Sequence, residues 1–533
     1  MTKGAVALVL HAHLPYVRSA QPGSLEEDWF FQALIECYLP LLETLELASA
    51  DPHQQPKLTI GLSPTLLSLL SDQDLKQRFP DWLKERLDLL PKADPSLRAG
   101  AEHLAATIER HQRAWQSCDG DLIQRFAALQ RQGVVDLLTC GATHGYLPLL
   151  RHHPEAVRGQ LRTAVREHQR LVGERPLGIW LPECAYYEGL DRWMRDAGLR
   201  YAVLDGHGLL HGRPRPRYGV YAPICSRNGV AFFGRDSDAT LPVWSAKDGY
   251  PGDPHYREFH RDLGWDLPIE ELKPLGLDQP RPLGLKLHRV TDHSAPLDRK
   301  RPYEPGVAAE RVKEHAADYL QGRRRQLDQL SAAMDVSPLL VAPFDAELFG
   351  HWWFEGPAFL SQLFQQAPQE GVNFTRLRDV LNNVGQLQLC DPCPSSWGQG
   401  GYHDYWLNDS NAWIIPEWEK ASAAMVQRCS RGVGSEQAMQ WLQQAARELL
   451  LAQSSDWSFI LRAGTTTELA KERVQRHLGR FWQLMQAIDG TSELREGWLE
   501  EVQTDDRLFP LIQPLDWAAV QPTPTAQSSA PNA

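Results

Sequence analysis

Short runs of apolar and β-branched residues recur along the chain, and segments with the spacing of amphipathic helices separate most of them. Runs of this length, bounded by turn residues, are typical of strands buried in a parallel sheet. Their alternation with helices predicts an α/β fold with a seven- or eight-stranded β/α barrel. The predicted strands are 5–10, 58–62, 135–140, 178–181, 201–205, 230–234 and 339–344. The main helical segments are 26–50, 65–90, 155–173, 187–198 and 307–334.

Two segments interrupt this alternation, a charged helical stretch near 96–133 and a Gly-, Pro- and Asp-rich excursion over about 245–305. Both are predicted to be insertions that cover the barrel mouth. From about Lys420 the spacing is helical, which predicts a C-terminal all-helical domain. The sequence after residue 520, QPTPTAQSSAPNA, lacks core-forming residues and predicts disorder. The predicted organisation is a barrel over 1–395, a helical domain over 396–520 and a disordered tail over 521–533.

Size and charge narrow the class of partner. The chain has 533 residues and a formal net charge of −12, without long basic runs. The length allows a large core and more than one structural unit. The charge argues against nucleic acid and anionic membranes as partners and suits an uncharged polymer. No apolar segment reaches about 18 residues, so no membrane span is expected, and the expected assembly is a monomer.

Eight irregularly spaced cysteines, together with a first apolar run that is too short for a signal peptide, indicate a cytoplasmic protein with free thiols. Cys390 and Cys393 form one C-x-x-C, but no second pair follows. A structural loop is therefore favoured over a metal knuckle at this place.

Polar side chains follow six of the seven predicted strands. They are His11 and His13 after the first strand, His144 after the third, Glu183 after the fourth, Asp205 after the fifth, Arg235 after the sixth and Asp345 after the seventh. In a parallel β/α barrel the carboxyl ends of the strands build the active site. These residues are therefore candidates for chemistry.

Glu183 and Asp345 both stand in apolar, aromatic segments, so neither is expected to be simply solvated. Pro182 precedes Glu183 and fixes the backbone there. Trp352 and Trp353 follow Asp345 closely. Two strand-end carboxylates are the minimum equipment of a glycosidase, and acids next to aromatic faces suggest carbohydrate chemistry.

His11 and His13 lie two residues apart after a strand, so both point to the same side of an extended chain. They could be the first two ligands of a metal-dependent amidohydrolase or deacetylase, completed by His144 and Asp345. Uncharged imidazoles could instead hydrogen-bond sugar hydroxyls, or merely satisfy local backbone groups. The residues alone leave these alternatives open.

Five ordered motifs resemble those of glycoside hydrolase family 57. They are VLHAHLPY (9–16), GATHGYLPLL (141–150), WLPECAY (180–186), APFDAELFGHWWFEG (342–356) and SSWGQGGYHDYWLN (395–408). The similarity extends to about residue 490, and within the family these segments look most like the 1,4-α-glucan branching enzymes. The resemblance implies a (β/α)7 barrel, a storage α-glucan of the glycogen or starch type as substrate, and no cofactor or metal. The same fold could also support 4-α-glucanotransfer, α-amylase-type hydrolysis or glucan binding without catalysis.

Carried over position by position, the resemblance implies that Glu183 is the nucleophile and Asp345 the general acid/base of a retaining double displacement. The two carboxyl groups should then lie roughly 5–5.5 Å apart. Implied substrate contacts are Arg235, Gly252, Trp397 and Asp456, with Trp352 and Trp353 as further candidates. His11, His13 and His144 are implied to bind sugar or to orient a carboxylate.

The sequence departs from the family pattern at one substrate position. Nine residues after Asp456, where relatives usually have glutamine, this chain has Thr465, so one substrate hydrogen bond is in doubt. The segment between Gly252 and Asp345 is expected to be longer than in many relatives and to alter specificity. Family members place a tyrosine on a mobile loop near the mouth, for which Tyr218 is the nearest candidate.

Overall fold

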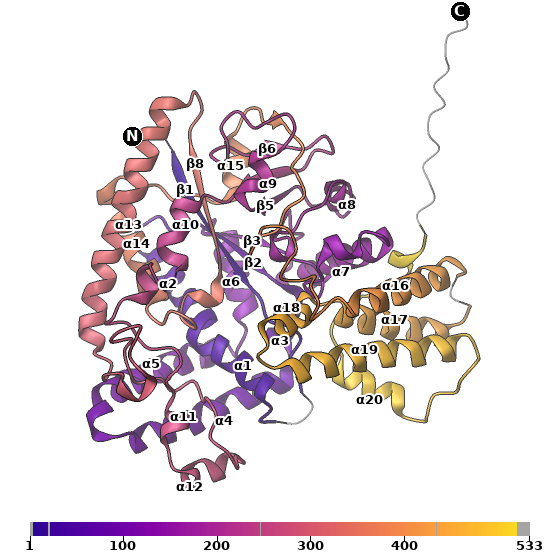
Figure 1. Cartoon of the computed structure of the whole chain (residues 1–533), viewed down its shortest axis with the longest axis horizontal. Coiled ribbons are helices and arrows are strands. Elements are labelled where there is room, and N and C mark those ends of the chain that lie inside the picture. Colours follow the sequence, from indigo (N-terminus) through magenta and orange to yellow (C-terminus); the bar gives the residue numbers. More distant parts are fainter. Residues whose placement is uncertain (1–3, 20–21, 246, 433, 520–533) are drawn as a thin grey trace, which may run out of the picture.

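The computed structural model describes residues 4–19, 22–245, 247–432 and 434–519. Strands lie at the centre of the molecule and helices surround them, while the last helices gather at one side (Figure 1). The strands are β1 (Ala5–Ala12), β2 (Leu58–Leu62), β3 (Val135–Leu138), β4 (Gly178–Ile179), β5 (Tyr201–Leu204), β6 (Ile224–Cys225), β7 (Ala231–Gly234), β8 (Leu339–Asp345) and β9 (Gln388–Leu389).

Seven parallel strands follow one another around the core. One sheet has the order β3-β2-β1-β8, and the other has the order β4-β5-β7-β6-β9. A parallel bridge between Thr139 and Ile179 joins β3 to β4. The Asp236 N–H donates to the Val341 carbonyl at 2.9 Å and joins the end of β7 to β8. The seven predicted strands are confirmed, in a β/α barrel arrangement. The short strands β6 and β9 were not predicted.

The register of the central strands brings candidate residues together. Strands β1 and β8 run parallel and place His11 directly opposite Asp345. Both strands are almost wholly buried, as expected for apolar runs that face helices on one side and the barrel interior on the other. The carboxyl ends of the strands therefore converge on one mouth.

Helices of the barrel region follow the predicted alternation. They are α1 (Leu25–Ala33), α2 (Leu39–Ala50), α3 (Pro64–Ser71), α4 (Gln73–Leu89), α5 (Arg98–Gln116), α6 (Leu122–Arg131), α7 (Pro154–Val172), α8 (Leu190–Asp196), α9 (Gly206–Leu210), α10 (Ser237–Trp244), α11 (Leu263–Asp266), α12 (Ile269–Leu272), α13 (Pro305–Ala333), α14 (Gly356–Glu370) and α15 (Leu377–Asn383). Ser63 caps α3 by accepting from the Leu66 N–H, which also fixes the Ser63 hydroxyl at the end of β2.

The two interrupting segments contain elements of their own. Helices α5 and α6 occupy 96–133, and α6 packs against β3 and α2. The segment 245–305 carries α11 and α12, and its Leu283, Leu285 and Leu287 are buried in the main core. The assignment of both as insertions and the boundary at residue 395 stay predictions, and the predicted tail 521–533 lies outside the described residues.

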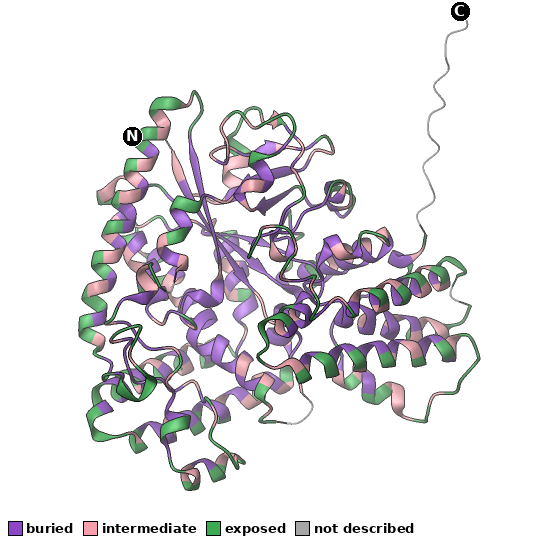
Figure 2. Cartoon of the chain, in the orientation of Figure 1, coloured by how far each residue is buried: buried purple, intermediate pink, exposed green. Residues whose placement is uncertain are grey.

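A C-terminal helical region is present, as predicted, and its described residues form α16 (Ile414–Ser430), α17 (Glu436–Ala452), α18 (Ser455–Ala463), α19 (Thr467–Ile488) and α20 (Trp498–Asp505). Their buried faces point toward one another and toward the barrel, and their outer faces are exposed (Figure 2). The turn Pro514–Trp517 packs against both α7 and α16, so it ties this region to the barrel. None of the described helices has the length and apolar character that a membrane span needs.

Candidate active site

Glu183 lies just after β4, in the short turn Pro182–Cys184. Its φ of 61° and ψ of 25° are left-handed, and Cys184 and His144 also have positive φ values, of 48° and 55°. A residue other than glycine costs about 1–3 kcal/mol in such a conformation. Three strained residues close together indicate a site whose geometry is selected for chemistry.

The carboxylate of Glu183 accepts two hydrogen bonds. The Trp397 indole Nε1–H donates to Oε2 at 2.7 Å, and the Ser455 hydroxyl donates to Oε1 at 3.0 Å. Burial raises the pKa of Glu183 to about 7, and the negative charge of Asp345 adds to this, while the two donors oppose it. Glu183 is therefore a largely buried acid, with 13% of its side chain exposed, whose pKa lies near neutral pH.

Asp345 ends β8 and lies opposite His11. Burial raises the pKa of its carboxyl well above the ordinary range, the nearby charge of Glu347 raises it further, and Arg235 opposes the shift. In the described part of the chain, no side chain or backbone group donates a hydrogen bond to this carboxyl. Asp345 is therefore favoured in its protonated form, with its proton free for a ligand.

Glu347, two residues after Asp345, is a third buried carboxyl of the site. It accepts from the His13 backbone N–H at 3.0 Å and from the Tyr38 hydroxyl at 2.5 Å. Burial raises its pKa to about 7. No role for Glu347 is expected from the sequence, although its place in the Asp345 motif is a signal.

His11, His144 and Ser455 form a directed chain of hydrogen bonds that ends at Glu183. His11 Nε2 lies 3.0 Å from His144 Nε2, and His144 Nδ1 lies 2.7 Å from the Ser455 hydroxyl. Burial lowers the pKa of both imidazoles, which are therefore neutral. When Ser455 donates its single proton to ionised Glu183, its oxygen must accept from His144 Nδ1–H, and His144 Nε2 must accept from His11 Nε2–H. Within the described chain, the buried His11 Nδ1 has no hydrogen-bond partner.

His13 joins the barrel to the start of α18. Its Nδ1 lies 2.9 Å from the Ser63 hydroxyl, and its Nε2 lies 3.1 Å from an oxygen of Asp456. Burial alone would raise the pKa of Asp456, but the adjacent His13 lowers it to about 2. The C-terminal region therefore supplies two residues, Ser455 and Asp456, to the barrel mouth.

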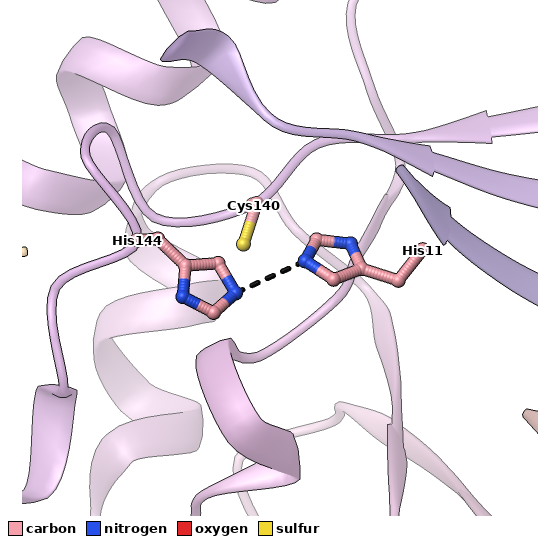
Figure 3. Close-up of side chains that lie close together, drawn as sticks. All are labelled: His11, Cys140 and His144. Carbon is pink, nitrogen blue, oxygen red and sulfur yellow. Dashed lines mark hydrogen bonds between the residues drawn. The ribbon is translucent and has the colours of Figure 1, made fainter. Parts of the chain in front are cut away.

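Two groups of side chains at the mouth could hold a metal ion by donor type and spacing. One is His11, Cys140 and His144, whose donor atoms lie within 4.8 Å of one another, and the other is His13, His144 and Asp456. Figure 3 shows the Cys140 thiol beside the paired imidazoles of the first group. Asp345 belongs to neither group within the described residues, so the ligand set of the amidohydrolase alternative does not form one cluster.

The remaining predicted substrate residues differ in their contacts and in their exposure. Arg235 follows β7, donates to the Thr240 hydroxyl at 3.1 Å and lies 3.5 Å from Asp205. Trp352 is 44% exposed, whereas Trp353 is only 2% exposed and packs against Tyr256 and Phe359 in the core.

Gly252 lies in the turn Tyr250–Gly252, where the Tyr250 ring stacks on His315 and packs against Phe359. These contacts are with α13 and α14, and among the described contacts neither Glu183 nor Asp345 lies beside this turn. Thr465 is exposed in the turn after α18.

The interpretation of Tyr218 as a tyrosine of the barrel mouth is wrong for this structure. Its hydroxyl donates to Asp335, and its ring lines a cavity with Gly4, Ala5 and Leu339. Because β1 and β8 begin at these residues, Tyr218 lies at the end of the barrel opposite the carboxylates. Sequence spacing could not distinguish the two ends.

Comparison with known proteins agrees with the motifs. The family described as "Glycosyl hydrolase family 57" matches residues 7–391, and that described as "1,4-alpha-glucan branching enzyme, C-terminal" matches residues 417–517. A 1,4-α-glucan branching enzyme of Thermococcus kodakarensis is 31% identical over 95% of this chain and 77% of its own.

Two solved structures have closely similar folds. An α-amylase of Thermotoga maritima is 34% identical, with a TM-score of 0.89 over 97% of this chain and 99% of its own. A family 57 branching enzyme of Pyrococcus horikoshii is 31% identical, with a TM-score of 0.88 over 98% of each chain. The chain described above, with its buried carboxylates at the mouth of a β/α barrel, belongs to glycosyl hydrolase family 57.

Proposed function

We propose that the protein is a retaining 1,4-α-glucan branching enzyme, which cleaves an α-1,4 bond and transfers the freed chain to a glucose 6-hydroxyl. The observation that carries the proposal is the joint match of one chain to the family 57 domain and to the C-terminal domain of branching enzymes. Helix α18 lies inside the second match and brings Ser455 to Glu183. The C-terminal region therefore takes part in the site itself.

In the first half of the reaction, Asp345 protonates the glycosidic oxygen while Glu183 attacks the anomeric carbon from the opposite face. The bond between that carbon and the glycosidic oxygen breaks, and a covalent glucanosyl ester forms on Glu183. In the second half, ionised Asp345 takes the proton of an acceptor 6-hydroxyl, whose oxygen displaces Glu183. Two inversions retain the anomeric configuration, and this route needs carboxyl groups roughly 5–5.5 Å apart.

The environments of the two carboxyls support this division of roles. Glu183 accepts two hydrogen bonds, which stabilise its ionised form as a nucleophile. Asp345 has burial and Glu347 to hold its proton, and no donor in the described chain competes for its oxygens. Such a pair, with environments that favour opposite protonation states, is the arrangement that acid and nucleophile require.

We assign sugar binding at the mouth to Arg235, Trp397, Asp456 and His13, with His11 and His144 as groups that orient Glu183. Trp352 and Gly252 are peripheral candidates for contact with the glucan. Trp353 supports the loop from within the core. No metal or cofactor takes part in this proposal.

Transfer also requires that a sugar hydroxyl outcompete water for the covalent intermediate. Aromatic side chains next to Glu183 favour this. The Trp397 ring packs edge-on against Trp180 at 5.1 Å and lies 5.8 Å from Trp244. Trp180 is fully buried behind the other two rings, so Trp397 and Trp244 supply the apolar surface beside the nucleophile, which would bind a sugar face more readily than a water molecule.

Hydrolysis of the α-amylase type is the second candidate, because one of the closely similar structures belongs to an α-amylase. The chemistry differs only in the acceptor, which is water in hydrolysis. The same two carboxylates would serve both reactions, so the site geometry favours neither.

Proton NMR of amylose incubated with the purified enzyme separates the two. A growing α-1,6 anomeric signal with few new reducing ends is the expected result. New reducing ends without α-1,6 signal would establish hydrolysis, and redistributed chain lengths without either signal would establish 4-α-glucanotransfer. The same reaction with the Glu183→Gln variant provides the baseline.

For the cellular setting we propose a cytoplasmic monomer that acts on storage glucan of the glycogen or starch type. The eight cysteines are all free thiols, and five of them are buried, which suits a reducing compartment.

A further inference from the structure

A pocket that the proposed mechanism does not use lies at the carboxyl end of β5. It is lined by Asp205 and His207, which follow β5, and by Gly398, Gly400, Gly401 and Tyr402 of the loop after Trp397. Asp205 was recognised in the sequence as a strand-end acid, but the family resemblance gave it no role. The pocket is open to solvent, and the Tyr402 side chain is 50% exposed.

His207 holds the loop against the barrel. Its Nδ1 lies 3.3 Å from an oxygen of Asp205, and its Nε2 lies 2.9 Å from the Gly401 carbonyl. Both partners are acceptors, so the doubly protonated imidazolium satisfies them best. The hydrogen bond to Asp205 raises the pKa of His207 accordingly.

The loop can approach His207 this closely only because residue 401 is glycine. Its φ is +74°, and an added Cβ would lie 2.9 Å from the His207 ring. The approach fixes the position of Tyr402, whose ring meets His207 edge-on at 5.1 Å while half of the residue stays exposed. An exposed aromatic face beside charged hydrogen-bonding groups is the combination that binds a sugar ring.

Asp205 has spare capacity to accept hydroxyl groups. One oxygen faces His207, and the other lies 3.5 Å from Arg235, which is a long contact. The Gly206 backbone N–H also binds this carboxylate. An ionised carboxylate offers about four lone pairs, so at least one remains. About a fifth of the side chain is exposed, which leaves it within reach of a ligand.

Two contacts connect the residues of the pocket to the catalytic centre. Gly398 directly follows Trp397, whose indole binds Glu183. Arg235, which contacts Asp205, also lies close enough to Asp345 for its charge to act on that carboxyl. A glucan whose cleaved bond lies at Glu183 would therefore extend one of its neighbouring units over this pocket.

We propose that Asp205, His207 and the loop Gly398–Tyr402 form a binding subsite for one glucose unit of the α-glucan chain, with Asp205 accepting its hydroxyls and Tyr402 covering its ring. This deepens the proposed function and rests on it for the identity of the ligand. His207 acts as a positioning residue that fixes both partners.

The test measures maltoheptaose binding by calorimetry in the full-length Glu183→Gln protein, which cannot turn the ligand over. Asp205→Asn and Tyr402→Ala should each raise the Kd about tenfold, whereas Tyr402→Phe should keep it within about twofold because the ring face remains. Tyr218→Ala and Asp335→Asn are matched controls at the opposite end of the barrel, where the same residue types are paired and exposed. Thermal unfolding confirms that each variant is folded.

Unchanged binding in both Asp205→Asn and Tyr402→Ala would overturn the subsite. Weaker binding in Asp205→Asn alone would also overturn it, because the carboxylate would then act only through Arg235. The same experiments distinguish failure of the subsite from failure of the proposed branching activity. Binding that depends on both residues, in a protein whose wild type forms no α-1,6 linkages, would keep the subsite and reject branching.

Discussion

Largely buried carboxylates and histidines meet at two places that can be compared among the described residues, the barrel mouth and the space between the C-terminal helices. The mouth cluster contains Glu183 and Asp345 with their histidine neighbours, and the helical cluster contains Glu448, His477 and Asp506. Burial raises the pKa of Glu183 and of Glu448 alike, to about 7. A raised pKa therefore does not tell a catalytic site from a structural one.

The difference lies in what surrounds the acids. Glu448 accepts from His477 Nδ1 at 2.7 Å and from the Gln444 amide at 2.8 Å, and its side chain is wholly buried. Asp506 accepts from Arg480, which closes the network. At the mouth, Glu183 has a left-handed backbone and Asp345 receives no hydrogen bond within the described chain. A fully hydrogen-bonded network stabilises a fold. A strained backbone and a carboxyl oxygen that accepts no hydrogen bond instead indicate a site for chemistry.

The largest expected effect comes from removing the charge at Glu183. Glu183→Gln keeps the shape but cannot form the covalent ester, so transfer activity should fall by about 10⁴-fold or more. Glu448→Gln is the matched variant, because it makes the same change in an acid of similar pKa. Initial rates with amylose should stay within about twofold of wild type in Glu448→Gln. Comparable loss in both variants would erase the distinction between the clusters.

Asp345→Asn should reduce turnover of amylose by about 10²–10⁴-fold, because the leaving group then departs without a proton. A donor with a good leaving group, α-maltosyl fluoride, needs no such proton. The variant should therefore release fluoride much faster than it cleaves amylose. Equal loss with both donors would show that Asp345 is not the general acid.

Most of the barrel could be predicted because its strands are buried on both faces and leave short, continuous apolar runs. All seven predicted runs correspond to parallel strands from β1 to β8. Strands β6 and β9 have two residues each and, unlike the equally short β4 in the run 178–181, do not lie in a continuous apolar run. Glu183 and Asp345 could be found because strand ends in such a barrel meet at one mouth.

The support around these acids could not be predicted, because it depends on tertiary packing. Ser455 reaches Glu183 across 272 positions of sequence, and Tyr38 reaches Glu347 across 309. Tyr218 was placed wrongly because local sequence does not show at which end of the barrel a loop residue lies. The family resemblance suggested Trp353 as a substrate contact, and only the packing in the structure showed that this side chain lies in the core.

The helical cluster should reveal itself through stability. The folded pKa of Glu448, about 7, lies above its ordinary value of 4.5. Its contribution to stability is therefore complete below pH 4.5 and is lost as pH rises through 7. The glutamine of Glu448→Gln has no proton to lose. The free energy of unfolding of the wild type should therefore fall by about 1–3 kcal/mol relative to that of the variant over this pH window.

Urea unfolding at several pH values measures this difference. The opposite trend from His477, whose pKa burial lowers to about 3, is present in both proteins. Glu468→Gln on the exposed face of α19 is the control and should show no such slope. A flat difference for Glu448→Gln would mean that the carboxyl is already ionised in the folded protein.

The smallest expected effect concerns Glu347, which belongs to the mouth cluster but touches no reacting atom in the proposed mechanism. The alkaline limb of the rate profile reports loss of the proton from Asp345. Burial is the main reason that the Asp345 pKa is raised, and the charge of Glu347 adds to it. Glu347→Gln removes that charge and can still accept from the His13 N–H and the Tyr38 hydroxyl. The Asp345 pKa should therefore fall, and the alkaline limb of kcat/KM should move to lower pH while activity at the optimum is largely kept.

Glu448→Gln should leave the limb in place, because its charge is remote. A limb that stays fixed or moves upward in Glu347→Gln would show that the third acid of the mouth is structural, like those of the helical cluster.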